Sequence, residues 1–419
     1  ESGDVPENFI EKILHHGTFF SNFIVAGNST RVSVNAFFNG FFGGTTGFNY
    51  HYQCDDDFNE SQVISLADIF KFNGYRIVAI SQGDVYLPTF GFDQFHIFQD
   101  TFTPDRIEAM LGLEGSPTFA YLHFSNLHDV AFGRPEIMTP ENYRRYLNEL
   151  AEEVEQVWKR VVGPEDVAVI VSDHGCHLRR SYDPDWHFFF EEEPTGGIFL
   201  SEETVRGICS IIAPACFPQR RVDSLVRGVD IFPTLLDGLG IPRPRVQGCS
   251  LWKAINDRED FPQLCAYMET GGVRMADGQA ISRGIRSRGW KYNRYETKGE
   301  ELFNLMDDPG ERNNLIERSP GDADRMRRKF WNQVQENLAG VEPFYDVDRN
   351  LVQRILGARQ RQPDVIKGER PSCFKGMIVD TVRSYLRTQL EHYLPLWRLR
   401  LERIVIYSAS TGVQPSSMI

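Results

Sequence analysis

The chain has 419 residues, of which 41% are hydrophobic and 25% charged, so it is long enough to bury a large core. Its formal net charge of −13 argues against a general nucleic-acid binder, and no apolar run reaches the length of a transmembrane segment. Its seven cysteines are scattered without a Cys-x-x-Cys pair, which excludes zinc-ribbon and thioredoxin-like sites.

The first elements predicted from the pattern are a helix over residues 6–16 and a strand over residues 18–26. Asn, Ser and Thr then precede an apolar stretch that ends at a glycine, which predicts a second helix over residues 31–39. Thr30 stands at the N-terminus of that helix, where unpaired amides and the helix dipole favour an anion and help to ionise a hydroxyl. Taken alone, Thr30 or Ser29 is better explained as an ordinary N-cap.

The next third of the chain alternates helices and strands. Helical spacing over residues 62–73 leads to a strand over 75–80, and a further strand over 119–124 leads to His128. Apolar residues at intervals of three and four predict a long amphipathic helix over residues 139–161. His128 therefore lies just past the end of a strand, where a loop histidine without a role is the alternative explanation.

Residues 167–171 are apolar and mostly β-branched, which predicts a fully buried strand in the middle of a sheet. The strand is followed by Ser-Asp-His-Gly. Since open parallel sheets bind ligands beyond the carboxyl ends of their strands, Asp173 and His174 are candidate ligands for a divalent cation. A polar turn that satisfies only its own backbone is the alternative. If the strands are parallel, His128 lies at the same edge of the sheet as Asp173.

A polar and aromatic loop over residues 176–195 carries Arg179 and His187, which we interpret as substrate contacts or as part of a solvated loop. Four further elements follow: a strand over 208–213, a helix over 229–240, a small antiparallel sheet over 281–305 and a charged helix over 321–338. Residues 372–407 are helix-like and basic. We expect them to dock on the domain or to form an oligomer contact, with a membrane-surface helix as the alternative.

Several stretches, in this order along the chain, resemble the sulfatase/alkaline phosphatase superfamily. They are Ser172–Gly175, Gly197–Pro214, Val229–Asp237, Gln247–Leu251, Arg286–Tyr292, Glu300–Leu305 and Asp308–Glu311. The resemblance implies an α/β fold with a mostly parallel central sheet flanked by helices, a small C-terminal antiparallel subdomain and a helical C-terminal extension. The expected divisions are a catalytic domain over 1–260, its subdomain over 261–338 and the extension over 339–419.

In this superfamily the nucleophile lies ten positions before the glycine that ends the early helix, and counting back from Gly40 gives Thr30. Sulfatases of the usual type have Cys-x-Pro-Ser-Arg there, with the Cys oxidised to formylglycine, whereas this chain has Thr30–Val34, Thr-Arg-Val-Ser-Val. It is thus similar to the Thr-nucleophile branch of phosphodiesterases, lipoteichoic-acid synthases and phosphoethanolamine transferases. Phosphate esters are then expected to be cleaved ahead of aryl sulfates. The alternatives are a sulfatase (sulfuric ester hydrolase) and an inactive sulfatase-like binding or scaffolding domain.

The resemblance also implies the role of each candidate residue. Asp173, His174 and Thr30 would bind a divalent metal ion (Zn, Mn, Mg or Ca), with Thr30 as the nucleophile. His128 would hold an ester oxygen or protonate the leaving group. Basic residues would contact the anionic phosphate- or sulfate-ester substrate: Arg31, Arg179 and His187.

The Asp that closes the family's first strand has no counterpart, since that strand precedes the first helix and this sequence begins at Glu1. We therefore expect an exposed pair of sheet edges, weak metal binding and little activity from the chain as written. An added N-terminal strand ending in Asp should recover metal binding and activity. Asp4 and Asp129 are the alternative fourth ligands.

Overall fold

The fold was obtained as a computed structural model. It describes residues 7–48, 62–82, 87, 91–98, 102–112, 117–125, 127, 140–175, 199–257, 260–270, 282–295, 299–359 and 364–367. Residues 1–369 form one compact unit, to which every element below belongs, and residues 370–419 form a second. The predicted helix-like segment 372–407 lies outside the described residues. Within the described part of the chain, no helix is long and apolar enough to cross a membrane.

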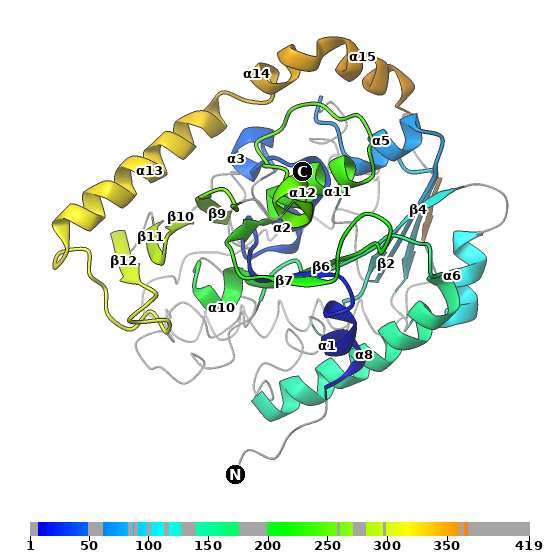
Figure 1. The fold of residues 1–419 in the computed structure, drawn as a ribbon, viewed down its shortest axis with the longest axis horizontal. Coiled ribbons are helices and arrows are strands. Elements are labelled where there is room, and N and C mark those ends of the chain that lie inside the picture. The colour runs from blue at the N-terminus through cyan, green and yellow to red at the C-terminus, as the bar shows by residue number, and fades with distance from the viewer. Residues whose placement is uncertain are drawn as a thin grey trace, which may run out of the picture. The chain divides into compact units, whose positions relative to one another are not determined.

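Three sheets organise the first unit (Figure 1). One is parallel, in the order β13 (Asp364–Lys367), β3 (Gln94–Phe98), β2 (Arg76–Gln82) and β4 (Thr118–His123). The second is mixed: β5 (Ala168–Val171), β6 (Arg206–Ile212), β1 (Thr18–Ile24) and β7 (Arg220–Val222), with β8 (Val226–Arg227) also on β1. The third is antiparallel: β12 (Gly299–Asn304), β11 (Trp290–Tyr295), β10 (Ser282–Ser287) and β9 (Ala266–Thr270). The predicted fold class is confirmed.

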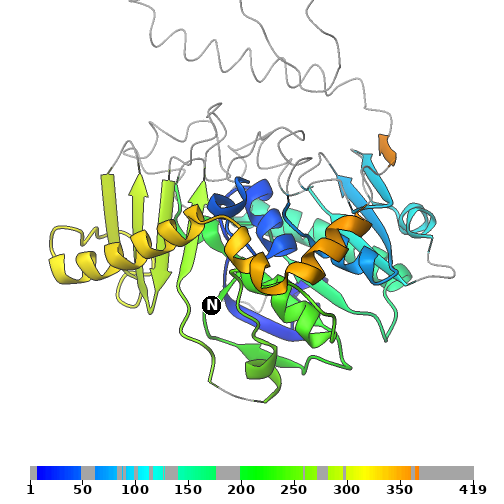
Figure 2. The same cartoon turned by 90° about the horizontal axis from the view of Figure 1, so that it is seen from above.

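Helices connect and cover these sheets. The described ones are α1 (Phe9–Leu14), α2 (Thr30–Asn39), α3 (Gly43–Thr46), α5 (Leu66–Phe72), α6 (Pro104–Leu111), α8 (Pro140–Val161), α10 (Glu202–Val205), η3 (Gly228–Asp230), α11 (Ile231–Gly238), α12 (Trp252–Asn256), α13 (Pro320–Leu338), α14 (Glu342–Tyr345), η4 (Asp346–Asp348) and α15 (Arg349–Ala358). The parallel sheet and the antiparallel sheet lie on opposite sides of α2 in both views (Figures 1 and 2).

Among the described strands, the one expected in the middle of the sheet lies at an edge. Among the described strands, β5 pairs only with β6, and that pairing is antiparallel. Every residue of β5 is half-buried, and Val167 just before it is 40% exposed. The prediction of a central, fully buried strand was therefore wrong in position. A run of β-branched residues specifies an extended backbone but does not specify which strands lie beside it.

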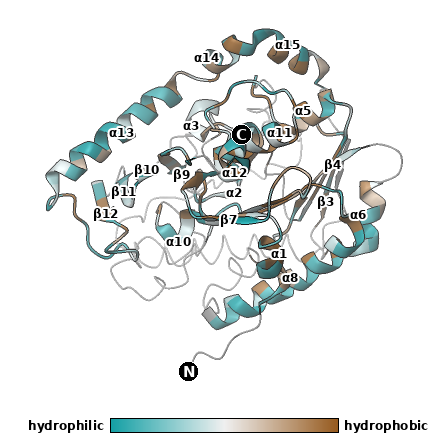
Figure 3. Ribbon diagram, in the orientation of Figure 1, coloured by the Kyte–Doolittle hydropathy of each residue, from teal (hydrophilic) through white to brown (hydrophobic). Residues whose placement is uncertain are grey.

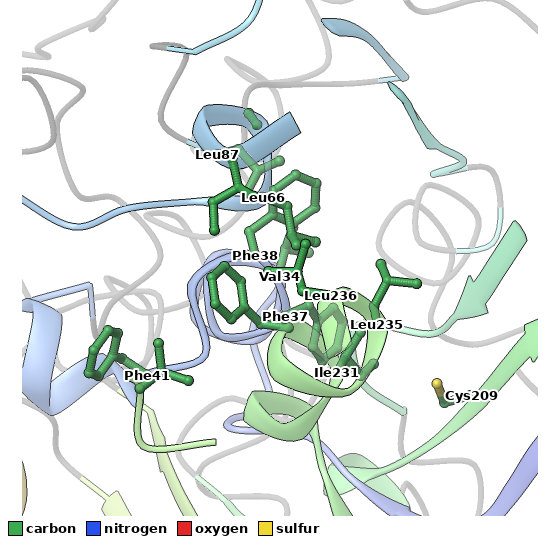
Figure 4. Close-up of a cluster of buried hydrophobic side chains, with 14 of the residues drawn as sticks. Val34, Phe37, Phe38, Phe41, Leu66, Leu87, Cys209, Ile231, Leu235 and Leu236 are labelled. Carbon is green, nitrogen blue, oxygen red and sulfur yellow. The ribbon is translucent and has the colours of Figure 1, made fainter. Parts of the chain in front are cut away.

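Helix α2 lies at the centre of the largest hydrophobic cluster (Figure 4). All of its residues except Arg31 are buried, and its C-terminus is a left-handed glycine, Gly40, as the sequence predicted. Phe37 contacts Phe23 of β1, while the ring of Phe38 meets Tyr121 of β4 edge-on at a centroid distance of 5.2 Å. One helix thus packs on two sheets. Each buried phenylalanine contributes about 1.5–3 kcal/mol, so this packing fixes where the N-terminus of α2 lies.

Helix α8 covers another part of both sheets with one apolar stripe, while its other face is polar (Figure 3). Val157 belongs to the cluster built on β2, and Ala151 belongs to the cluster that includes Ile170 of β5. Because α8 follows β4 and precedes β5, it connects the two strands whose ends carry the candidate site residues.

The C-terminal helices complete the unit. Helix α13 runs across the antiparallel sheet (Figure 2), with Phe330 packed against Tyr292. Residues 342–358, which we had placed in an extension, pack on the main core through Val352 and Ile355. The boundary expected at residue 260 stays a prediction.

Candidate active site

The N-terminus of α2 is held by three hydrogen bonds around a tight loop. The Ser33 hydroxyl donates to the Gly27 carbonyl at 2.8 Å, and the Asn28 side chain donates to the Phe199 carbonyl at 2.7 Å. The Ser33 amide donates to the Ser29 carbonyl at 3.1 Å, which closes the first helical turn. Thr30 is the first helical residue and is only 5% exposed. Its hydroxyl is thereby placed at the helix N-terminus, where the helix dipole favours negative charge.

Residues 172–175 form a turn that is hydrogen-bonded to β6 at its start and to residue 204 at its end. The Ser172 amide donates to the Ile208 carbonyl, and the Ser172 hydroxyl accepts from the Ile208 amide, both at 3.0 Å. The Gly175 amide donates to the Thr204 carbonyl at 2.9 Å. A side chain at Gly175 would lie 2.1 Å from the Glu203 carbonyl oxygen, so only glycine fits this approach.

The two loops meet at Thr30 and Asp173, where the Thr30 hydroxyl acts on the Asp173 carboxylate as a donor that favours its charged form. Burial favours the neutral acid and would raise the pKa of Asp173. The charges of His174 and His123, together with the Thr30 hydrogen bond, outweigh burial and hold the pKa below its usual value. Asp173 is therefore an anion whose charge faces Thr30 and two imidazoles.

His123 is the residue that the sequence analysis missed. It closes β4, its Nδ1 lies 3.0 Å from the Tyr121 hydroxyl, and its charge acts on Asp173. The available signal was its place as the last residue of a parallel strand, where ligands bind. The sequence analysis instead proposed His128, five positions later, as the histidine that contacts the ester at this end of the strand. His128 lies outside the described residues.

The donor set fits a divalent cation. His174 Nδ1 lies 2.7 Å from the Gly175 carbonyl, so it carries the hydrogen of that bond, while Nε2 lies 3.3 Å from Asp173 Oδ2. A protonated imidazole forms an ion pair with Oδ2 at this distance, whereas a neutral one presents a second acceptor that a cation could share with Asp173. Among the described residues, however, no group of three or more His, Cys, Asp and Glu side chains is close enough to hold a metal ion. The metal site therefore stays a prediction.

The remaining candidates divide between residues inside and outside the described part. Arg31 lies in the first turn of α2 and is half-buried. The Ser29 side chain makes no N-cap hydrogen bond, and its buried hydroxyl has no hydrogen-bond partner among the described contacts. Arg179 and His187 lie outside the described residues, as do Asp4 and Asp129.

Comparison with known proteins finds sulfatases, although no family model matches the chain. Over 194 residues it is 28% identical to Delta 4,5-hexuronate-2-O-sulfatase of Bacteroides thetaiotaomicron, a match that covers 42% of this chain and 38% of that protein. Over 128 residues it is 30% identical to arylsulfatase K of Bos taurus, covering 29% and 24% of the two chains. The match thus spans less than two-fifths of the length of either relative.

The fold itself is similar to solved sulfatases over most of its length. A structure described as a 2-O GAG sulfatase aligns with a TM-score of 0.55 at 18% identity, covering 78% of this chain and 86% of that one. The chain therefore has the sulfatase fold, and the resemblance to the sulfatase/alkaline phosphatase superfamily is confirmed at the level of fold. Both sequence relatives are sulfatases, which favours the sulfuric ester hydrolase that we held as an alternative over the phosphate-ester reading.

Proposed function

We propose that this chain is a hydrolase of sulfate esters carried by sugars, with Thr30 as its nucleophile. The placement of the Thr30 hydroxyl beside the Asp173 carboxylate carries the proposal, because it brings a candidate nucleophile to a proton acceptor at a helix N-terminus. The sulfatase names of both sequence relatives support the ester class. The 2-O-sulfated hexuronate named for one of them is the first sugar to test.

In the first step, Thr30 Oγ1 attacks sulfur while its proton passes to Asp173. The bond between sulfur and the sugar oxygen breaks, and protonated His123 donates a proton to that leaving oxygen. In the second step, water attacks the sulfated Thr30 and gives one proton to His123. The sulfur–Oγ1 bond breaks, Asp173 returns its proton to Oγ1, and hydrogensulfate, which keeps the second proton of the water, leaves and loses that proton to solvent.

The helix N-terminus stabilises the charge that moves onto the sulfate oxygens during these steps. The N-terminal amides and the dipole of α2 favour negative charge there, and Arg31 in the first turn adds a full positive charge. A sulfate monoester carries one negative charge, whereas a phosphate monoester approaches two at neutral pH. The less charged ester is easier to place beside the anionic Asp173.

A divalent cation held by Asp173 and His174, with the Thr30 oxygen beside them, would supply the positive charge that lowers the pKa of the hydroxyl. The pKa of Asp173 is lowered, so its carboxylate can take the Thr30 proton only if the pKa of the hydroxyl is lowered as well, which is what such a cation would do.

A second candidate function is cleavage of phosphate esters, and the identity of residue 30 favours it. Residue 30 is a threonine, whose hydroxyl resembles the nucleophile of the Thr-nucleophile branch. Formylglycine sulfatases have an oxidised cysteine at the corresponding position. The same side chains would then form a phospho-threonine, which water hydrolyses by the same proton transfers. An inactive binding domain is the third reading.

Turnover of p-nitrophenyl sulfate, p-nitrophenyl phosphate and bis-p-nitrophenyl phosphate, each with Mg²⁺, Ca²⁺, Mn²⁺ or Zn²⁺, separates the three functions. We expect the sulfate to be cleaved fastest. Faster cleavage of either phosphate ester would replace the proposal by the second candidate. If no ester is turned over under any condition but the chain binds a 2-O-sulfated hexuronate, the chain is an inactive binding domain.

A further inference from the structure

Four charged side chains, far from one another in the sequence, meet in the interior beside the antiparallel sheet. Lys291 of β11 is fully buried, and its Nζ lies 2.8 Å from Glu311 Oε1 and 3.3 Å from Glu202 Oε1. Arg286, the cross-strand neighbour of Lys291, places its Nε 3.4 Å from Glu202 Oε1. We call Lys291, Glu202, Glu311 and Arg286 the buried charge cluster. Its two positive and two negative charges balance, so removing one leaves an uncompensated buried charge.

The cluster holds residues 199–205 from one side. The Glu202 amide donates to Glu311 Oε2 at 2.7 Å, so Glu311 caps the first turn of α10 in place of an N-cap side chain. Glu311 adopts a φ of 53°, which is costly for a residue with a side chain. The rings of Phe199 and Tyr295 meet at a centroid distance of 5.4 Å. Residues 199–205 are thus attached to the antiparallel sheet through this charge cluster, through the ring contact and through a hydrogen bond from the Asn293 side chain to the Leu200 carbonyl at 3.5 Å.

The same seven residues hold both halves of the candidate site from the other side. The Phe199 carbonyl accepts from Asn28, two residues before Thr30. The Thr204 carbonyl accepts from the Gly175 amide, next to His174. The Val205 carbonyl accepts from the Val25 amide at 2.9 Å, at the end of β1. The loop before α2 and the turn after β5 therefore share one support.

We propose that Lys291 is a positioning residue for the candidate site: through Glu202 and Glu311 it fixes residues 199–205, and these fix Thr30 against Asp173. Lys291 touches neither loop. Its influence passes through residues 199–205, because the carbonyls of Phe199 and Thr204 accept the hydrogen bonds from the two loops. A sheet that belongs to the C-terminal part of the unit thereby controls the geometry of residues 28–30 and 173–175.

Amide hydrogen exchange tests this positioning without any assumption about activity. In Lys291→Met, we expect the Gly175 and Val25 amides to exchange roughly 100-fold faster, because their acceptor segment loosens when an unpaired carboxylate remains beneath it. The Gly40 amide, bonded within α2 at 3.0 Å, reports global unfolding. The measured quantity is the fold-increase in the exchange rate of the Gly175 amide divided by the fold-increase for the Gly40 amide. We expect this exchange ratio to be about 10 or more.

Two further variants make the exchange result decisive. Glu202→Gln keeps the side-chain size and removes one charge, so it reports the same ratio if Lys291→Met does not fold. Lys329→Met is the matched control, because Lys329 bonds to Ser287 of the same sheet at 2.7 Å and its described bonds avoid residues 199–205. A ratio near one in both Lys291→Met and Glu202→Gln, or an equal ratio in Lys329→Met, would overturn the proposal.

A kinetic measurement adds to this and rests on the proposed function. Misplacing a nucleophile by about 1 Å lowers kcat roughly 100-fold, so Lys291→Met should lose kcat with KM changed less than about threefold. An unchanged kcat with a raised exchange ratio would show that residues 199–205 move without disturbing the site, and would overturn the link to Thr30. Absence of turnover in the wild-type chain is a failure of the proposed function alone, and the exchange ratio still decides the positioning role.

Discussion

Replacing Gly175 with alanine should damage the candidate site more than the fold. The added Cβ would lie 2.1 Å from the Glu203 carbonyl oxygen, so the turn must retreat by roughly 1.3 Å to reach an ordinary contact. That movement breaks the hydrogen bond from the Gly175 amide to Thr204, which is worth about 1 kcal/mol. Overpacking adds about 1–3 kcal/mol to the loss of stability.

The movement matters for function because Asp173 lies two residues from Gly175 and its carboxylate lies beside the Thr30 hydroxyl. A displacement of about 1 Å at reacting groups costs roughly 100-fold in kcat. The assay combines initial rates on the ester that the chain cleaves best with urea unfolding. Gly321→Ala in the first turn of α13 is the control, since its new Cβ meets nothing within 4 Å. Wild-type kcat in Gly175→Ala would refute the claim that this close approach sets the site.

Three further predictions test separate features. Gly40→Ala should lower the free energy of unfolding, measured in urea, by about 2–4 kcal/mol. Residue 40 has a φ of 74°, and a new Cβ would lie 2.8 Å from Val246 Cγ2. A loss below about 0.5 kcal/mol would contradict this. Burial raises the pKa of Glu269 in the folded chain, so its contribution to stability is greatest below the unfolded pKa of about 4.3 and is lost as the pH rises toward the folded pKa. Wild type should therefore lose stability relative to Glu269→Gln as the pH rises from about 4, and a difference in unfolding free energy that stays constant with pH would disprove this. His123→Gln should lower kcat by about 100-fold or more if His123 protonates the leaving group, and the loss should be smaller for esters with better leaving groups; an equal loss for all esters would assign His123 another role.

The sequence predicted α2 well because local signals and packing agree there. Cap residues precede the helix, a left-handed glycine ends it at Gly40, and the apolar residues between them are all buried. The same signals placed Thr30 at the helix N-terminus. Residues 172–175 were found because a strand signal ended in a polar turn, which is also a local pattern.

What the sequence could not predict depends on contacts between distant residues. Strand β5 was placed in mid-sheet, yet its pairing with β6 leaves it at an edge among the described strands. His123 was passed over because nothing near it in the sequence shows that its charge acts on Asp173. The buried charge cluster joins residues 202, 286, 291 and 311, whose pairing no local pattern encodes.

The most direct test of the central claim compares Thr30→Ala with Thr30→Ser. Both variants keep the buried position nearly filled, but only serine keeps a hydroxyl that can donate to Asp173 and attack the ester. We expect Thr30→Ala to lose sulfate-ester turnover by roughly 1,000-fold or more, with Thr30→Ser within about tenfold of wild type and both variants folded by circular dichroism. Turnover by Thr30→Ala within tenfold of wild type would show that Thr30 is not the nucleophile.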